Sequence, residues 1–391
     1  MSDEPVVRMG ETSAGVTRPS VSPIYQTTAF DVPDLEILQQ LYAGQLTGDI
    51  YTRDSNPGMR ALAQSIAGLE QTEAGAVFAS GMGALGSIFL TLLSAGDHVL
   101  TAQSLYGKTL QLASRMQRFG ISVSAFDVSS PAQLTAQLQP NTRFVLVETV
   151  ANPLLEVADI PALVAAAGAV PLIVDSTFTT PELIRPCQLG AAAVIHSASK
   201  YLNGHGDVML GVAAGSAQLM ARLNETASIF GQNANPFECW LTQRGLRTLP
   251  LRMRQICSTA GRLAQFLTTH PAVLKVHHPS LPQHPSHALA ERMYPQGTGG
   301  IVAIELQTGG RTGIETVNQF MHSVPQLPFS PTLADARTTL SHPALTSHRF
   351  LSPEMRSAAG ISDALLRISV GLEPLDVLVQ EFDAGLKTLL K

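Results

Sequence analysis

The sequence is poor in charged residues and in cysteine. Only 14% of its 391 residues are Asp, Glu, Lys or Arg, well below the value of about 25% that is usual in soluble domains. The three cysteines, Cys187, Cys239 and Cys257, are widely spaced and form no CxxC pair. Neither a disulfide framework nor a zinc ribbon is therefore expected. This cysteine usage fits a reducing compartment, so we expect a cytoplasmic protein without a metal site.

A strong net charge is also missing. The formal charge is −5, which leaves no basic field to hold nucleic acid or an anionic membrane surface. The first segment, MSDEPVVRMG, is acidic and polar, unlike a signal peptide. The most apolar stretch, 157–174, contains Asp159, Gly168 and two prolines, and this pattern indicates a helix and a strand rather than a membrane span. We expect neither nucleic acid nor a membrane as a partner.

Apolar residues are plentiful, at 45% of the chain. This content excludes disorder as the main state and is enough for a large core spread over two or three domains. So little charge also suggests that part of the surface is covered, most simply by another subunit.

Helical and strand patterns alternate from about residue 59 onward. Short apolar runs bounded by turns are typical of strands buried on both faces of a parallel sheet. The expected strands are 99–101, 121–126, 144–147, 171–174, 192–195 and 208–213, and the expected helices are 59–69, 82–93, 109–119, 131–138, 160–167 and 181–189. The pattern predicts an α/β fold with a sheet between about residues 75 and 215.

The pattern changes after about residue 235. Expected elements are a long helix at 251–267, short strands at 273–276, 301–306 and 365–370, and helices at 313–321 and 376–390. They predict a smaller α+β domain. We therefore divide the chain into an N-terminal arm (1–50), a large domain (51–235) and a C-terminal domain (236–391), with the arm lying across the large domain or a neighbour.

Two residues at expected strand ends suggest chemistry. Lys200, in HSASKY, is flanked by hydroxyl groups, and a partly desolvated amine there would be poised for Schiff-base formation. A surface lysine in a polar loop is the alternative. Asp175 ends the apolar run PLIVD, where a carboxylate is costly unless it meets a cation or donors. A pyridinium nitrogen would satisfy it, but a carboxylate that caps the next turn is equally compatible.

A glycine-rich helix start supplies a third feature. In ASGMGA, exposed N–H groups and the helix dipole would favour a phosphate, and Ser197 and Ser199 could donate to the same group. Tight packing is the alternative. The stretch matches neither a Walker loop nor the dinucleotide GxGxxG fingerprint, which argues against a nicotinamide or flavin oxidoreductase. An amine, a pyridinium partner and a phosphate cradle are together what pyridoxal phosphate (PLP) requires.

The chain resembles the Cys/Met-metabolism family of PLP enzymes, the transsulfuration group, from about Ser22 to its end. The matching stretches, in order, are SPIYQTTAF, YTRDSNPG, ASGMGAL, LYGKT, VETVANPLLEVADI, VDSTFTTP, HSASKYLNGHGDVMLG, LTQRGLRTLPLRM, LSHPALTSH and LLRISVGLE. The resemblance implies an aspartate-aminotransferase-like large domain (PLP fold type I) with an arm and a C-terminal domain. It also implies a homo-oligomer, usually a tetramer of two catalytic dimers, that acts on a small amino acid.

The resemblance further implies PLP as the cofactor and a role for individual residues. Lys200 would be the Schiff-base lysine, Asp175 would pair with the ring nitrogen, and Tyr106 would stack on the ring and assist the leaving group. The implied phosphate binders of the same subunit are Gly81, Met82, Ser197 and Ser199.

Other roles implied by the resemblance involve substrate and neighbour. Tyr51 and Arg53 would reach the phosphate of the neighbouring subunit's cofactor, and Asn152 would lie near the ring hydroxyl. Arg367 would grip the substrate carboxylate, and Thr332, in SPTLAD, is placed with the substrate-binding residues. Taken singly, a core tyrosine and surface ion pairs are alternative interpretations.

The resemblance implies γ-replacement or γ-elimination, of the cystathionine γ-synthase or γ-lyase type. Three positions depart from the family's subgroups: Gln111 replaces an arginine usual in cystathionine enzymes, Pro331 replaces a glutamate, and Lys108 replaces a cysteine usual in methionine γ-lyases. SGMGA and GHGD favour an O-acylhomoserine sulfhydrylase or a methionine γ-lyase, which stay as alternatives. A non-catalytic PLP-binding protein is the alternative of another class.

Lys108 also suggests a hypothesis about the substrate. A cation beside the start of a helix gains nothing from the helix dipole. We expect Lys108 to face the distal end of the substrate and pair with a carboxylate, as in a succinyl group or the cysteine half of cystathionine. A solvated loop lysine is the alternative.

Overall fold

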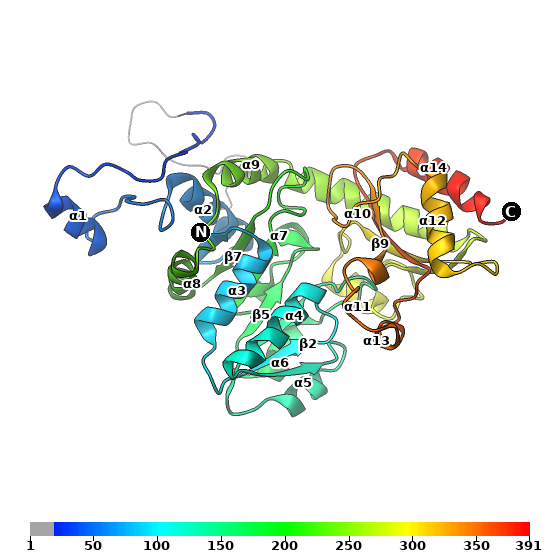
Figure 1. Cartoon of the computed structure of the whole chain (residues 1–391), viewed down its shortest axis with the longest axis horizontal. Coiled ribbons are helices and arrows are strands. Elements are labelled where there is room, and N and C mark those ends of the chain that lie inside the picture. The colour runs from blue at the N-terminus through cyan, green and yellow to red at the C-terminus, as the bar shows by residue number, and fades with distance from the viewer. Residues whose placement is uncertain (1–18) are drawn as a thin grey trace.

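The computed structural model describes residues 19–391 and contains two β-sheets (Figure 1). The first part of the expected arm, residues 1–18 with its polar N-terminal segment, lies outside the described residues. Within the described part of the chain, no helix is long and apolar enough to cross a membrane.

The larger sheet has seven strands in the order β1-β7-β6-β5-β4-β2-β3. The strands are β1 (Ala74–Phe78), β2 (His98–Ala102), β3 (Ser122–Phe126), β4 (Thr142–Glu148), β5 (Leu172–Asp175), β6 (Ala193–Ser197) and β7 (Gly211–Gly215). The strands from β3 to β6 pair in parallel, and β7 alone runs antiparallel to both of its neighbours. The expected α/β fold with a mostly parallel sheet is confirmed.

Strand β1 was not among the expected strands. Its sequence, AGAVF, begins with residues that have little β-propensity. Gly75 is required there because α2 lies against the strand: a Cβ at this position would be 2.3 Å from the carbonyl oxygen of Ala63. Strand β7 also begins later than expected, at Gly211 rather than at residue 208.

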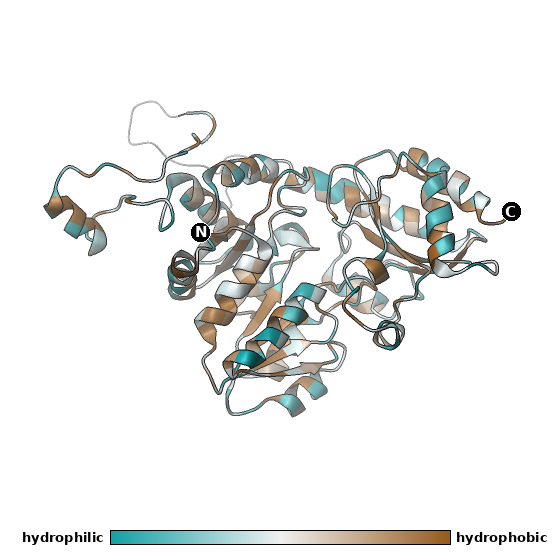
Figure 2. Ribbon diagram, viewed as in Figure 1, coloured by the Kyte–Doolittle hydropathy of each residue, from teal (hydrophilic) through white to brown (hydrophobic). Residues whose placement is uncertain are grey.

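Helices cover both faces of this sheet. They are α2 (Pro57–Glu70), α3 (Gly81–Leu92), α4 (Gly107–Met116), α5 (Pro131–Gln137), α6 (Ile160–Ala167), α7 (Thr180–Leu183), α8 (Ala217–Phe230) and α9 (Pro236–Leu246), with short 3-10 turns η2 (Gln117–Phe119) and η3 (Pro186–Leu189). Side chains along β1 alternate between two cores: Ala76 and Phe78 pack with α3 and α8, whereas Val77 packs with α2 and α9. In Figure 2 the strand β5 is hydrophobic and the outer helix α4 is hydrophilic.

The expected single helix at 181–189 is wrong. Helix α7 ends at Leu183, Ile184 and Arg185 are extended, and a separate 3-10 turn begins at Pro186. Proline disfavours a helical conformation in the residue before it and cannot donate a helical hydrogen bond, so the helix is interrupted there.

The smaller sheet is antiparallel, with the order β10-β11-β9-β8. The elements of this part are α10 (Leu249–Thr268), β8 (Val273–His277), α11 (His287–Met293), β9 (Ile301–Leu306), α12 (Gly313–Ser323), β10 (Thr339–Ser341), η4 (Pro343–Leu345), α13 (Pro353–Ala358), β11 (Leu365–Ser369) and α14 (Leu375–Thr388). Apolar side chains of α10, α12 and α14 share one core with the strands.

Helix α1 (Leu35–Tyr42) stands apart from the rest of the molecule in Figure 1. It was not expected from the sequence, although Asp34 caps it by accepting the N–H of Ile37. None of its residues is buried, and Leu35 and Tyr42 are 76% and 74% exposed. An amphipathic helix with its apolar side chains exposed is typical of a segment that packs on another chain.

Arg252 connects α10 to the turn that follows β6. It is only 5% exposed, and its guanidinium donates to the carbonyl oxygens of Tyr201, Leu202 and Gly245 at 2.6, 3.2 and 2.8 Å. The backbone around Lys200 is thereby attached to the long helix that leads into the smaller sheet.

We predict that Arg252→Met destabilises the protein by about 2 kcal/mol or more, because the carbonyl groups of Tyr201 and Leu202 lose their donor and each costs about 1–3 kcal/mol. The matched control is Arg254→Met on the exposed side of the same helix, for which we expect a change within about 0.5 kcal/mol. Urea unfolding followed by fluorescence measures both. Equal midpoints for the two variants would contradict the role of Arg252.

Candidate active site

Two carboxyl groups stand side by side at the ends of parallel strands. Glu148 ends β4, Asp175 ends β5, and the two are register partners in the sheet. Asp175 accepts hydrogen bonds from the N–H of Thr177 at 3.0 Å and from its hydroxyl at 2.5 Å. Burial raises the pKa of Asp175, although the Thr177 bonds and the nearby His196 act in the opposite direction. Burial and the charge of Asp175 raise the pKa of Glu148 well above its ordinary value.

Thr177 also connects this pair to the end of β6. Its hydroxyl oxygen accepts the N–H of Ser197 at 2.9 Å, and Ser197 lies against the start of α3. A Cβ on Gly81 would be 2.9 Å from the Cβ of Ser197. The glycine therefore allows the first-turn amides of α3, which have no partner within their own helix, to lie close to a serine hydroxyl.

Ser80 and Gly211 complete the surroundings of this helix start. The Ser80 hydroxyl caps α3 by accepting the N–H of Gly83 at 3.0 Å, which leaves the amides of Gly81 and Met82 for an external acceptor. A Cβ on Gly211 would be 2.1 Å from the Ser80 carbonyl oxygen. Close approach of β7 thus requires a second glycine here.

Ser199 is arranged differently from Ser197. Its oxygen accepts the N–H of Leu210 at 2.9 Å, and its hydroxyl donates to the Leu210 carbonyl at 3.3 Å. The bond to the carbonyl is long, so a stronger acceptor could redirect the hydroxyl proton. Ser199 therefore joins the turn to β7 in the single chain.

Lys200 lies in this turn, and its amine points to the C-terminal part of the chain. The Nζ atom donates to the Thr332 hydroxyl at 3.1 Å. Burial, followed by the charge of Arg367, lowers the pKa of Lys200. A lowered pKa increases the fraction of neutral amine, which is the nucleophilic form.

Arg367, on β11, connects Asn152 of the large-sheet region with Thr332. Its guanidinium donates to the Asn152 side-chain oxygen at 3.0 Å and to the Thr332 carbonyl at 2.9 Å. Its Nε atom is buried and has no hydrogen-bond partner among the described residues. Burial lowers the pKa of Arg367 to about 10. A buried cation with a spare donor suits a carboxylate ligand.

Glu148 connects the segments that carry Tyr106 and Asn152. Its Oε1 atom accepts the N–H of Tyr106 at 2.6 Å, and it also accepts a backbone hydrogen bond from Asn152. Tyr106 precedes α4 and is 40% exposed, so its ring is available to a ligand. Glu148 was not among the expected site residues, although it lies in the matched stretch VETVANP and ends an apolar run just as Asp175 does.

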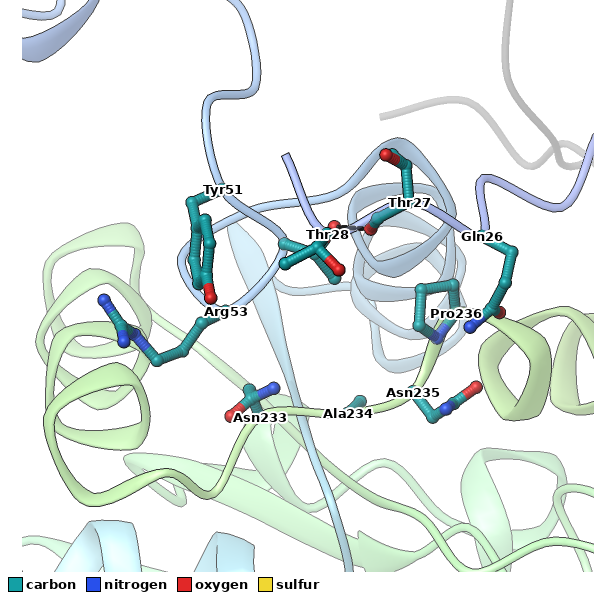
Figure 3. Close-up of a pocket in the computed structure, with 10 residues that line it drawn as sticks. Gln26, Thr27, Thr28, Tyr51, Arg53, Asn233, Ala234, Asn235 and Pro236 are labelled. Atoms are coloured by element: carbon teal, nitrogen blue, oxygen red, sulfur yellow. Dashed lines mark hydrogen bonds between the residues drawn. The ribbon is translucent and has the colours of Figure 1, made fainter. Parts of the chain in front are cut away.

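Tyr51 and Arg53 lie in a different place. They line an open pocket of about 440 Å³ together with the polar residues Gln26, Thr27, Thr28, Thr52, Asn233 and Asn235. Figure 3 shows the two side chains beside each other on one wall, with the Arg53 guanidinium 5.0 Å from the centre of the Tyr51 ring. Arg53 also pairs with Asp54 at 3.7 Å. The Arg53 side chain thus contacts Tyr51 and Asp54.

Lys108 is exposed in the first turn of α4. Its Nζ atom donates to the Gln111 side-chain oxygen at 3.2 Å. The neighbouring Gly107 faces the C-terminal segment around Ser347, since a Cβ there would be 2.5 Å from the Ser347 carbonyl oxygen. His348, the next residue of that segment, has its pKa lowered to about 4 by burial and by the charge of Arg367. Lys108 therefore comes directly after the residue at which α4 meets the segment that leads to Arg367.

No group of three or more His, Cys, Asp or Glu residues within 19–391 is placed to hold a metal ion.

Comparisons with known proteins identify relatives of nearly full length. The family profile described as "Cys/Met metabolism PLP-dependent enzyme" matches residues 4–387. The O-succinylhomoserine sulfhydrylase of Pseudomonas aeruginosa is 40% identical over 351 residues, covering 89% of this chain and 86% of that protein. The L-methionine gamma-lyase of Porphyromonas gingivalis is 37% identical over 375 residues, covering 94% and 93%.

A solved structure shows the same fold. The cystathionine gamma synthase of Xanthomonas oryzae pv. oryzae superposes with a TM-score of 0.90 at 32% identity, covering 98% of this chain and 97% of that one. The similarity extends over both sheets of the molecule.

The residues around Lys200 fit PLP in three respects. Glycines leave the α3 amides and Ser197 close together, which suits a phosphate. Two adjacent, partly buried carboxyl groups lack a cation bonded to them among the described residues, which suits a protonated ring nitrogen. The amine of Lys200 has a lowered pKa, which suits an aldehyde.

We predict that Gly81→Ala weakens PLP binding about tenfold or more, a loss of about 1.4 kcal/mol, because the added methyl group would displace Ser197. The matched control is Gly83→Ala, whose Cβ meets its nearest atom, the Ser80 oxygen, at 3.4 Å. This control should keep its affinity and gain helix stability. Titration of cofactor-free protein with PLP, followed by absorbance, measures both. Similar losses in the two variants would count against a phosphate site at Gly81.

Proposed function

The chain belongs to the Cys/Met metabolism family of PLP-dependent enzymes, and from this premise we propose which substrates it takes. It is a PLP-dependent lyase or transferase of sulfur amino-acid metabolism that acts at Cγ, as its relatives named methionine gamma-lyase and O-succinylhomoserine sulfhydrylase indicate. We propose that its substrates carry a second carboxylate at their distal end, as O-succinylhomoserine and cystathionine do.

Three groups of the chain would hold the cofactor. The amides of Gly81 and Met82, with the hydroxyls of Ser197 and Ser199, would bind the phosphate. Asp175 would face the ring nitrogen, and Asn152 would lie near the ring hydroxyl. Bound there, PLP supplies an electron sink for the carbanion left when the Cα proton departs.

Arg367 would bind the α-carboxylate of the substrate. Its free Nε donor and its position beside Thr332 support this role. Because Lys200 donates to the same threonine, a carboxylate on Arg367 would bring the substrate Cα close to the lysine amine. Lys200, as a neutral amine, would accept the Cα proton and deliver it elsewhere on the substrate. Tyr106, with its exposed ring, would stack on the cofactor and assist the leaving group at Cγ.

The observation that carries the choice of substrate is the position of Lys108. It lies two residues after Tyr106, at the junction of α4 with the segment that leads to Arg367. Its partner is the neutral amide of Gln111, so a distal carboxylate would give it its first ionic partner at the site. A substrate held by Arg367 at one end would then be held by Lys108 at the other.

We also propose a cytoplasmic homo-oligomer. Tyr51 and Arg53 line a polar pocket that opens to the outside (Figure 3), and α1 has no buried residue. In a dimer the two side chains would reach the phosphate of the neighbouring subunit, and further pairing of dimers would give a tetramer. The exposed apolar residues of α1 and the small share of charged residues support such an assembly.

We predict that Lys200 is the residue that PLP modifies. Cofactor-free protein is mixed with limiting PLP near neutral pH, reduced with borohydride and digested, and the labelled peptide is identified by mass spectrometry. The label should be on Lys200, because burial and Arg367 lower its pKa, and not on Lys108, Lys275, Lys387 or Lys391. A label distributed over those four lysines in both the native protein and a Lys200→Ala control would refute the assignment.

We predict that Lys108→Ala raises KM about two- to fivefold for O-succinylhomoserine and cystathionine, the range expected for loss of an exposed ion pair worth about 0.5–1 kcal/mol. O-acetylhomoserine and methionine, which lack the distal carboxylate, should keep their KM and serve as internal controls. Assays of 2-oxobutyrate and of thioether products give the constants and separate elimination from replacement. An unchanged KM for the two dicarboxylic substrates would remove the proposed role, and no turnover of any of the four would favour a non-catalytic PLP-binding protein.

A further inference from the structure

Glu148 has contacts that go beyond filling space at the end of β4. Its carboxylate accepts the backbone N–H of Tyr106 at 2.6 Å and a backbone hydrogen bond from Asn152. One side chain thus connects the turn before α4 with the loop that presents Asn152 to Arg367. A negative charge at this place also lies beside the N-terminus of α4, whose own N-cap residue makes no side-chain bond.

The second carboxylate is beside it. Asp175 is the register partner of Glu148 on the adjacent parallel strand, so the two side chains leave the same edge of the sheet on the same face. Two carboxyl groups sharing a desolvated site do not both ionise unless a cation compensates them. The pKa of each is raised from its ordinary value.

The basic side chains nearby are hydrogen-bonded to other groups. Lys200 and Arg367 both donate to Thr332, and Arg367 donates also to the Asn152 side chain. On the next strand, His196 pairs with Glu70 of α2 at 2.7 Å, with both side chains fully buried. Among the described residues, the donors to the pair are therefore neutral groups, namely backbone N–H groups and the Thr177 hydroxyl.

We propose that Glu148 and Asp175 share one proton when no cation lies against Asp175, and that both are ionised once a protonated ring nitrogen does. The proton that the pair gives up goes to the ring nitrogen if that nitrogen arrives neutral, and to solvent if it arrives already protonated, so the exchange balances in either case. Glu148 is then a positioning residue: in its ionised form it binds the N–H groups of Tyr106 and Asn152 more strongly. This inference rests on the proposed PLP site and concerns how that site responds to its cofactor.

The proposal is tested by measuring how many protons the protein takes up when PLP binds. Isothermal titration of cofactor-free protein with PLP, in buffers of different ionisation enthalpy, gives the protons taken up on binding. In Glu148→Gln the amide oxygen still accepts both N–H groups, but Asp175 is already ionised, so the variant has no shared proton to give up when PLP binds. We expect this variant to take up about one proton more than the wild type. Protons taken up or released by Lys200 and by the phosphate are the same in both proteins, so they cancel when the two proton counts are subtracted.

Glu156→Gln is the matched control. Glu156 lies eight residues further on, and burial raises its pKa as well, but its carboxylate bonds to Ser104 at 3.0 Å and has no register partner of like charge at a strand end. Its proton count should equal that of the wild type. Equal counts for all three proteins would overturn the inference, whereas failure of the wild type to bind PLP at all would overturn the proposed function instead.

Two further measurements detect the shared proton in cofactor-free protein without using the heat of PLP binding. Because the shared proton stays bound in the folded state above the ordinary carboxyl pKa, folded protein binds more protons than unfolded protein, and the unfolding free energy falls as pH rises through that window. Glu148→Gln should lack this fall relative to the wild type. Infrared spectra of the wild type should contain the C=O stretch of a protonated buried carboxyl group that disappears when PLP is added. Absence of that band from cofactor-free protein would contradict a shared proton even if the variant failed to fold.

Discussion

The arrangement of this molecule depends on two carboxyl groups that adjacent parallel strands force together. Register pairing of β4 with β5 places Glu148 beside Asp175, and burial makes their combined charge unfavourable. Hydrogen-bond donors around the pair are oriented toward that charge. Thr177, Tyr106 and Asn152 direct N–H or O–H groups at the pair. Because each of these donors belongs to a segment that carries another site residue, the charge of the pair organises the whole edge of the sheet.

The fold brings the remaining residues of the proposed site together from segments that are far apart in the sequence. Lys200 follows β6, the next strand of the same sheet, so strand order alone brings it to the edge that Asp175 occupies. Arg367 comes from β11 of the smaller sheet and meets Asn152, which is 215 residues earlier in the chain. Arg252 secures the connection between these parts, since it bonds the turn after Lys200 to the helix that leads into the smaller sheet. The site is therefore built where the two sheets meet, at the carboxyl ends of parallel strands.

Sequence patterns were informative where a strand end carried a polar residue. Asp175 and Lys200 stood out because each follows an apolar run, and the structure places Asp175 at the end of β5 and Lys200 in the turn after the neighbouring strand β6. Glu148 follows an equally apolar run, but its significance depends on register with β5, which no local pattern reveals. The contact of Arg367 with Thr332 is equally invisible to periodicity. Strand β1 was missed for a physical reason as well, since Gly75 is selected by the approach of α2 and not by strand propensity.

The two ends of the proposed substrate site differ in how firmly the chain holds them. Arg367 is fixed by two hydrogen bonds and is 5% exposed, so its geometry is set before a ligand arrives. Lys108 is exposed, and among residues 19–391 its amine bonds to a neutral side chain one turn away on its own helix. A rigid arginine suits the α-carboxylate, which every amino-acid substrate shares, whereas a long flexible lysine tolerates distal groups of different length. Substrate discrimination should therefore reside at the Lys108 end, and the chemistry common to the family at the buried end around Lys200.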